Sequence, residues 1–191
     1  MLDFLLRCIE LKDVDRTGWQ LRGVDRPEDV AAHSWNTAFL VMVFGDEADI
    51  DVDRAVKMAI VHDLAEAETG DIPRDGEEWE EARQTKEEDE RAAMQDLFDG
   101  IDRDTILGLW EEYEARETDE ARFVKDMDLI DMALQALRYE EQERYGEENR
   151  EEVEASDDLG DMLASAERRL RTPTGREIFD RIEERYEQVT D

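Results

Sequence analysis

Apolar positions recur every three or four residues along most of this 191-residue chain, a spacing typical of amphipathic helices. Strand-like alternation is nearly absent, and glycine and proline are scarce, at 10 and 3 residues. The pattern predicts about eight helices, at residues 2–9, 28–46, 53–67, 78–99, 103–115, 118–143, 158–170 and 174–188. We therefore expect an all-α fold, built as a single compact helical bundle.

Two of these helices are predicted in more detail. In the helix at 28–46 we expect one inward face, formed by Val30, Ala31, Trp35, Ala38 and Phe39. The helix at 53–67 is apolar on more than one side, which is typical of a central, buried helix. It is expected to follow capping residues Asp51 and Asp53 and to end near Gly70, because glycine suits a helix C-cap. The stretches 13–27 and 144–157 are predicted to be connections.

The charge of the chain is strongly acidic: 56 acidic and 24 basic residues give a formal net charge of −32. Such a charge also occurs in disordered chains, but the helical spacing of the apolar residues favours a folded protein. Molar salt shortens the screening length to roughly 3 Å, so acidic side chains can then crowd a surface with little repulsion. We predict a halophilic protein.

Composition also excludes several classes of function. Duplex nucleic acid requires a basic stripe, and none is found along this chain. The longest apolar runs, such as 37–44, are far too short to cross a membrane, and the N-terminus has no signal-peptide pattern. A single cysteine, Cys8, fits a reducing cytoplasm. The expected location is therefore the cytoplasm.

The only two histidines, His33 and His62, are the first candidates for chemistry. His62 is followed directly by Asp63, and Glu66 lies on the same helical face as both. Two imidazoles and a carboxylate suit a divalent transition metal such as Mn, Co, Fe or Zn, and they leave coordination positions open for catalysis. Spacing alone leaves the alternative open that these histidines are ordinary core residues.

Three segments around these residues resemble the signature of one branch of the HD-domain phosphohydrolases, the 5′-deoxynucleotidases. The segments are RTGW at 16–19 with RPEDVAAHS at 26–34, HDLAEAETGDIP at 62–73, and FVKDMDLIDMALQA at 123–136. They occur in the order of that family, and the resemblance extends over roughly residues 1–170.

The resemblance implies a metal centre with four ligands: His33, His62, Asp63 and Asp128. Spacing alone would not have identified Asp128, which is one acidic residue among 56. Asp126 and Asp131 flank it on other faces of the same helix, and we interpret them as solvated or as partners of the ligands.

The resemblance also implies a catalytic pair of acids, Glu66 and Asp71. They would orient a water, protonate the leaving 5′ oxygen, or hold a second, harder cation such as Mg²⁺. Trp19 resembles a substrate-contacting residue that packs on sugar or base, and either Arg16 or Arg22 would bind the phosphate.

The sequence thus predicts one HD domain over residues 1–191, with the metal-site core at about 28–140 and C-terminal helices at about 158–188. The predicted activity is metal-assisted hydrolysis of deoxyribonucleoside 5′-monophosphates by a cytoplasmic homodimer, with exposed apolar residues of the terminal helices as its contact. Two alternatives stay open: a hydrolase of another nucleotide, such as a guanosine polyphosphate alarmone, and a non-catalytic metal-bound helical module. Phosphate release from a panel of nucleotides separates the three.

Overall fold

The structure, a computed structural model, describes residues 1–72, 79–101, 104–144 and 159–190. These residues form helices joined by turns and no strand, which confirms the all-α fold. The helices are α1 (Leu2–Ile9), α2 (Thr17–Gln20), α3 (Val30–Phe44), α4 (Val52–Val61), α5 (Glu66–Thr69), α6 (Trp79–Leu97), α7 (Asp104–Ala115), α8 (Asp119–Glu141), α9 (Gly160–Arg169) and α10 (Pro173–Thr190), with 3-10 turns η1 (Glu10–Lys12) and η2 (Gly45–Ala48). All eight expected helices are present. The additional helices α2 and α5 are single turns, too short to show an apolar period.

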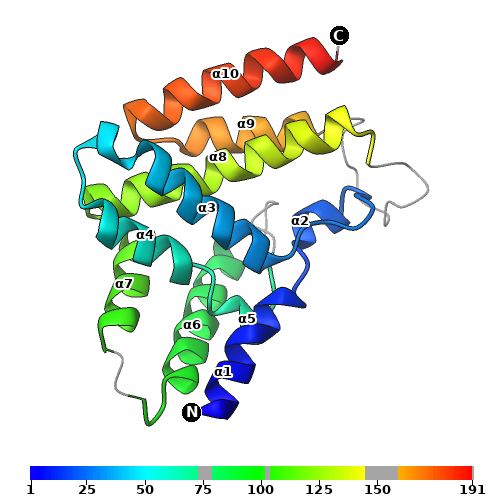
Figure 1. Ribbon diagram of the computed structural model, residues 1–191. Coiled ribbons are helices and arrows are strands. Elements are labelled where there is room, and N and C mark those ends of the chain that lie inside the picture. Colours follow the sequence, from blue (N-terminus) through cyan, green and yellow to red (C-terminus); the bar gives the residue numbers. More distant parts are fainter. Residues whose placement is uncertain (73–78, 102–103, 145–158, 191) are drawn as a thin grey trace.

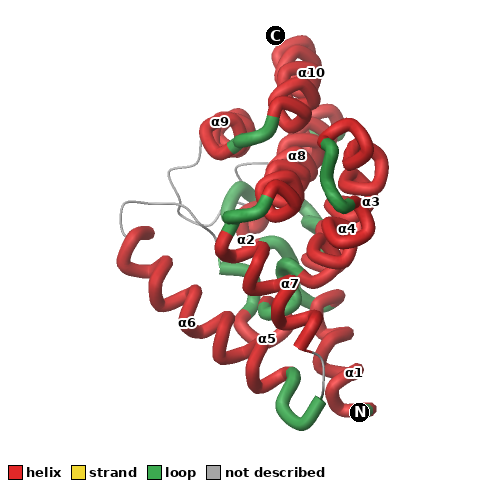
Figure 2. The backbone as a smooth tube through the Cα atoms, turned by 90° about the vertical axis from the view of Figure 1, so that its left-hand side faces the viewer, coloured by secondary structure: helices red, strands yellow, loops and turns green. Residues whose placement is uncertain are grey.

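Helix α8 forms the centre of the molecule. It packs against α3 and α4 on one side and against α9 and α10 on the other. Figure 1 shows α10, α9 and α8 stacked above α3 and α4, while α1, α5, α6 and α7 lie below them. The turned view in Figure 2 again places α8 between α10 and the lower helices. The longest helix is therefore covered on several sides, and any polar side chain on it must find partners inside the protein.

Local sequence explains where the main helices begin and end. The side chains of Asp29, Asp51 and Thr118 each accept a hydrogen bond from a backbone N–H in the first turn of α3, α4 and α8. Gly70 follows α5 with φ of +72°, a conformation that is accessible mainly to glycine. The predicted cap at Asp51 is confirmed, whereas Asp53 lies within the first turn of α4. Gly70 does end a helix, but this helix is the single turn α5 and not the longer helix for which the stop was predicted.

Two expectations about the helices are wrong. The helix expected at 53–67 ends at Val61, and residues 62–65 form a turn before α5. Trp35 and Phe39, expected to face inward, are 66% and 46% exposed. Since α3 carries apolar residues all around its axis, periodicity could not identify the buried face. Val30 and Ala38 of the expected face are buried, but the rest of the buried face consists of His33, Ser34, Thr37, Leu40 and Val41.

The predicted connection at 144–157 lies outside the described residues, apart from Arg144. Among the helices that the structure describes, none combines the length and the apolar character needed to span a bilayer.

Candidate metal centre and cleft

The two histidines are brought together by neighbouring helices. His33 lies in the first turns of α3, whose start is fixed by the Asp29 cap. His62 directly follows α4, which packs against α3. Both imidazoles are shielded from solvent, with exposed fractions of 0% and 2%. The turn at 62–65 also explains how adjacent residues, His62 and Asp63, can direct their side chains to one point.

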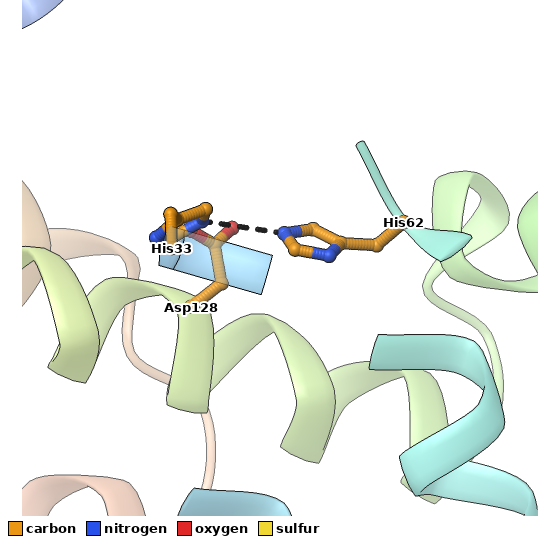
Figure 3. A group of neighbouring side chains, drawn as sticks. All are labelled: His33, His62 and Asp128. Atoms are coloured by element: carbon orange, nitrogen blue, oxygen red, sulfur yellow. Dashed lines mark hydrogen bonds and ion pairs between the residues drawn. The ribbon is translucent and has the colours of Figure 1, made fainter. Parts of the chain in front are cut away.

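Four side chains meet at this point. His33 Nε2 lies 3.3 Å from His62 Nε2 and 3.2 Å from Asp128 Oδ1. Asp63 Oδ2 lies 3.2 Å from His62 Nε2 and 3.5 Å from His33 Nε2. Figure 3 shows His33, His62 and Asp128 pointing toward one another, with Asp128 reaching up from α8. The structure thus brings together all four residues that the sequence singled out as ligands.

The geometry fits a transition-metal cation. Bonds of about 2.0 to 2.2 Å would place adjacent ligand atoms about 3.0 to 3.5 Å apart in tetrahedral or octahedral sites. The Nδ1 atom of each ring is already occupied, because it contacts Ala59 O at 2.7 Å in His62 and Asp131 Oδ2 at 2.5 Å in His33. Each imidazole therefore presents Nε2 to the shared point.

The surrounding carboxylates favour a positive charge at the point where the four side chains meet. Burial and the charge of Arg16 lower the pKa of His33, but hydrogen bonds with Asp128 and Asp131 outweigh them and raise it to about 10. The His33 imidazole is therefore protonated on both nitrogens when no cation is bound. Binding of a cation must displace the proton on Nε2.

Asp126 and Asp131 are both buried, so the interpretation of either as a solvated acid is wrong. Asp131 accepts hydrogen bonds from His33 Nδ1 and from the amide of Asn36, and it orients the imidazole as carboxylates do around metal-binding histidines. Asp126 faces away from the metal centre and binds the connection between α9 and α10. The reason is the central position of α8, which leaves no face of the helix to solvent at these residues.

The second carboxylate oxygen of Asp128, Oδ2, is held by two donors. Tyr113 Oη donates to Asp128 Oδ2 at 2.8 Å, and Lys125 Nζ contacts the same atom. Burial raises the pKa of Asp128, but the charge of Lys125 and the hydrogen bond with His33 hold it well below its usual range. Asp128 is therefore ionised and directs Oδ1 toward the histidines.

The predicted acidic pair lines a cleft beside this centre. The cleft holds about 80 Å³, enough for a phosphate group and a few waters. Both Glu66 and Asp71 line it, and Glu66 Oε2 is buried without a hydrogen-bond partner among the described residues. Burial, followed by the charges of Asp63 and Asp71, raises the pKa of Glu66 well above its ordinary value. Asp71 also holds the start of α2 in place, because its Oδ2 accepts a hydrogen bond from Thr17 N at 2.6 Å.

Of the two candidate arginines, only Arg16 is among the residues that line this cleft in the described part of the chain. Its Nη1 lies 3.4 Å from Asp63 Oδ2, beside the metal centre. Arg22 instead forms an ion pair with Asp161 and donates to the carbonyl of Gly18 at 2.9 Å. The structure thus places a guanidinium at the cleft, from Arg16.

Trp19 lines the cleft but is only 1% exposed. Its Nε1 donates to Glu28 Oε1 at 3.1 Å, and its ring meets Tyr139 edge-on at a centroid distance of 5.3 Å. Trp19 therefore also has the contacts of a core residue.

Sequence reasoning missed three basic residues of the cleft wall: Lys86, Lys125 and Arg169. Lys86 is buried, and its Nζ lies 3.5 Å from Glu66 Oε1 and 3.0 Å from the carbonyl of Ile72. The only signal in the sequence was the rarity of lysine, which occurs four times.

Comparisons with known proteins show the family to which the chain belongs. The model of the HD-domain family matches residues 8–167. The 5′-deoxynucleotidase HDDC2 of Homo sapiens is 42% identical over 144 residues, which cover 75% of this chain and 70% of that protein. The 5′-deoxynucleotidase hdd1 of Schizosaccharomyces pombe is 37% identical, over 71% of this chain and 70% of that protein.

Solved structures share the fold. A conserved hypothetical protein from Pyrococcus furiosus has a TM-score of 0.74 and 31% identity, and the match covers 96% of this chain and 99% of that one. A predicted metal-dependent phosphohydrolase from Magnetospirillum magnetotacticum has a TM-score of 0.66 and 26% identity, over 96% of this chain and 91% of that one. The similarity therefore extends over nearly the whole chain.

Proposed function

Since this chain belongs to the HD-domain family, we propose that it is a metal-dependent phosphohydrolase that removes the 5′-phosphate from deoxyribonucleoside 5′-monophosphates. One observation carries the proposal: two imidazoles and two carboxylates converge on one point beside a small cleft that also contains an arginine. Relatives that match about three quarters of the chain bear the name 5′-deoxynucleotidase.

The proposed ligands are His33, His62, Asp63 and Asp128. This nitrogen-and-oxygen set suits Mn, Co, Fe or Zn. When bound, such a cation would supply a Lewis acid that activates a water and neutralises charge on the phosphoryl oxygens. Asp131 would keep the His33 ring in the orientation that the site needs.

The cleft residues would bind the substrate and move its protons. Arg16 would hold the phosphate, because its guanidinium faces the cleft next to the metal centre. Glu66 would donate a proton to the leaving 5′ oxygen, in keeping with its burial and its raised pKa. Asp71 would hold α2 in place through its hydrogen bond with Thr17. It would thereby position Trp19, which lies on α2, for contact with the nucleoside. Glu66 and Asp71 together would form the site of a second cation such as Mg²⁺, if one is used.

A nucleotide panel tests the proposal. Purified protein, analysed for bound metal, is incubated in molar KCl with deoxyribo- and ribonucleoside 5′-monophosphates, 3′-monophosphates and guanosine polyphosphates. We expect phosphate release from the deoxyribonucleoside 5′-monophosphates, and its loss after chelation with recovery when metal is restored. Preferential cleavage of guanosine polyphosphates would support the alarmone alternative, and metal binding without any turnover would support a binding module.

We also propose that the protein acts in the cytoplasm at high salt and as a homodimer. Apolar residues of both terminal helices were expected to form the dimer contact, but α10 buries Phe179, Ile182 and Tyr186. Helix α1, in contrast, leaves Leu2, Leu5, Leu6 and Ile9 exposed. Further exposed apolar residues lie on α3 and α4. Among the described residues, the exposed large apolar side chains are Met1, Leu2, Leu5, Leu6, Ile9, Trp35, Phe39, Met42, Val43, Ile60 and Ile72.

A second copy is the partner we propose for these apolar residues, because exposed apolar side chains mark interaction sites and a contact between them would remove apolar area from water. Sedimentation in molar KCl tests this. We expect a dimer for the natural chain and a monomer for Trp35→Glu. A monomeric natural chain would contradict the proposal.

A further inference from the structure

A second pocket, next to the metal cleft, is lined by basic residues alone among the residues that the structure describes. Its lining consists of Arg116, Arg122, Lys125, Arg169 and Arg171, and its volume is about 470 Å³. Arg116 directly follows α7, Arg122 and Lys125 belong to α8, Arg169 ends α9, and Arg171 lies in the connection between α9 and α10. Lys125 and Arg169 also line the metal cleft, so the two cavities share a wall.

This concentration of positive charge is unexpected in the present chain. With 56 acidic residues against 24 basic ones, a surface arginine readily finds a carboxylate. Arg7, Arg54 and Arg185, for example, all form such ion pairs. In the basic pocket, by contrast, no carboxylate belongs to the lining within the described part of the chain.

Two arginines of the pocket have no partner for their side chains among the described residues. Arg116 Nε is buried and makes no hydrogen bond. Arg171 bonds only through its backbone N–H, which donates to Asp126. Arg122, in contrast, pairs with Asp119 on the exposed side of α8. Two guanidinium groups are therefore available to an anion from outside the protein.

The backbone around these arginines is held in place. The fully buried Asp126 carboxylate accepts hydrogen bonds from Arg171 N at 3.0 Å, from Thr172 N at 2.6 Å and from Thr172 Oγ1 at 2.7 Å. Gly175 permits this contact, because a Cβ at that position would lie 2.6 Å from Asp126 Oδ2. Arg116 directly follows α7 in the left-handed conformation, with φ of +54°. The pocket is thus formed in advance of any ligand.

We infer that this basic pocket binds a phosphate group beside the metal cleft. Guanidinium groups bind phosphate oxygens in pairs of parallel hydrogen bonds, and a phosphate dianion would neutralise the unpaired charge of Arg116 and Arg171. Two sources have this chemistry: the inorganic phosphate that the reaction releases, and a second phosphate carried by a nucleotide. The role in product release rests on the proposed function, whereas phosphate binding by the pocket does not.

The shared wall gives the pocket a direct relation to the cleft. Lys125 contacts Asp128 at the metal centre and lines both cavities, as does Arg169. A phosphate released from the cleft would therefore find a second group of cations directly beside the first. The same proximity would let a nucleotide place one phosphate at the metal centre and another in the pocket.

Binding of inorganic phosphate tests the inference. The metal-loaded protein is titrated with phosphate in molar KCl by calorimetry, for the natural chain, for Arg116→Gln with Arg171→Gln, and for Arg171→Gln alone. Arg185→Gln is the matched control, because it removes the same charge from an exposed arginine paired with Glu141. Melting temperature and metal content confirm that each variant is folded and loaded.

We expect the double variant to weaken phosphate binding at least about tenfold, the single variant to be intermediate, and the control to stay within about twofold. Unchanged phosphate affinity in the double variant would overturn the inference. This measurement needs no turnover, so it stands or fails separately from the proposed activity.

A second arm identifies the source of the phosphate. Binding of a deoxyribonucleoside 3′,5′-bisphosphate is compared with that of the 5′-monophosphate. Tighter binding of the bisphosphate that disappears in the double variant assigns the pocket to a second phosphate of the nucleotide. Equal binding of the two nucleotides, together with arginine-dependent inhibition of turnover by inorganic phosphate, assigns it to the product.

Discussion

The buried carboxylate of Asp131 offers a direct test of how the metal centre is organised. Asp131 is 1% exposed, and its two oxygens accept hydrogen bonds from His33 Nδ1 and from the Asn36 amide. Replacement by alanine leaves both donors without an acceptor in a region that water does not reach. The His33 ring is then free to rotate, and its Nε2 no longer points reliably at the cation.

The expected loss of metal affinity follows from these contacts. Loss of a carboxylate that orients a metal-binding histidine weakens metal affinity by about 10- to 100-fold, or about 1.4 to 2.7 kcal/mol. Asp131→Asn should weaken metal affinity by less than about tenfold. The new amide can accept from His33 with its oxygen, and Asn36 can turn its own amide to accept from the new NH₂ group. The predicted order of metal affinity is therefore natural chain, then Asp131→Asn, then Asp131→Ala.

Competition with a chelator of known affinity measures this order in molar KCl, and melting curves measure stability in parallel. Asp126→Ala is the control, because Asp126 is equally buried on α8 but binds the connection between α9 and α10. It should lower the melting temperature while keeping metal affinity within about twofold. Natural affinity in Asp131→Ala, or an equal loss in Asp126→Ala, would refute the assignment of Asp131.

Further predictions concern the ligands, the acid, the salt response and a helix cap. His62→Ala and Asp128→Asn should each abolish turnover and reduce bound metal, and full metal content with full activity in Asp128→Asn would exclude it as a ligand. Glu66→Gln should retain the metal, measured by elemental analysis, while turnover falls at least about a hundredfold; loss of metal would instead make Glu66 a ligand. Both kcat/KM and melting temperature should rise steeply as KCl increases from about 0.1 M to above about 1 M, because the screening length shrinks from roughly 10 Å to roughly 3 Å; maxima at low salt would contradict the halophilic prediction. Thr118→Ala should lower the free energy of unfolding by about 1 kcal/mol, measured by denaturant titration, since the Thr118 hydroxyl caps α8; an unchanged midpoint would show that this cap contributes nothing.

The sequence by itself determined the helices and much of the metal centre. Apolar spacing and capping residues are local properties, so the eight main helices could be predicted without knowing how they pack. The rarity of histidine drew attention to His33 and His62. Asp128 followed only from the resemblance to a family, because one acid among 56 has no local signature.

The tertiary structure decided which face of each helix is buried and which charges meet. Helix α3 is apolar all around, so only its packing against α4 and α8 exposes Trp35 and buries Thr37. Asp131 and Asp126 look alike in the sequence, but one orients His33 and the other anchors α10, because α8 presents them to different neighbours. The basic pocket combines residues from three separate parts of the chain, and no spacing rule connects them. Periodicity is set by neighbours along the helix, whereas partners are set by which helices pack together.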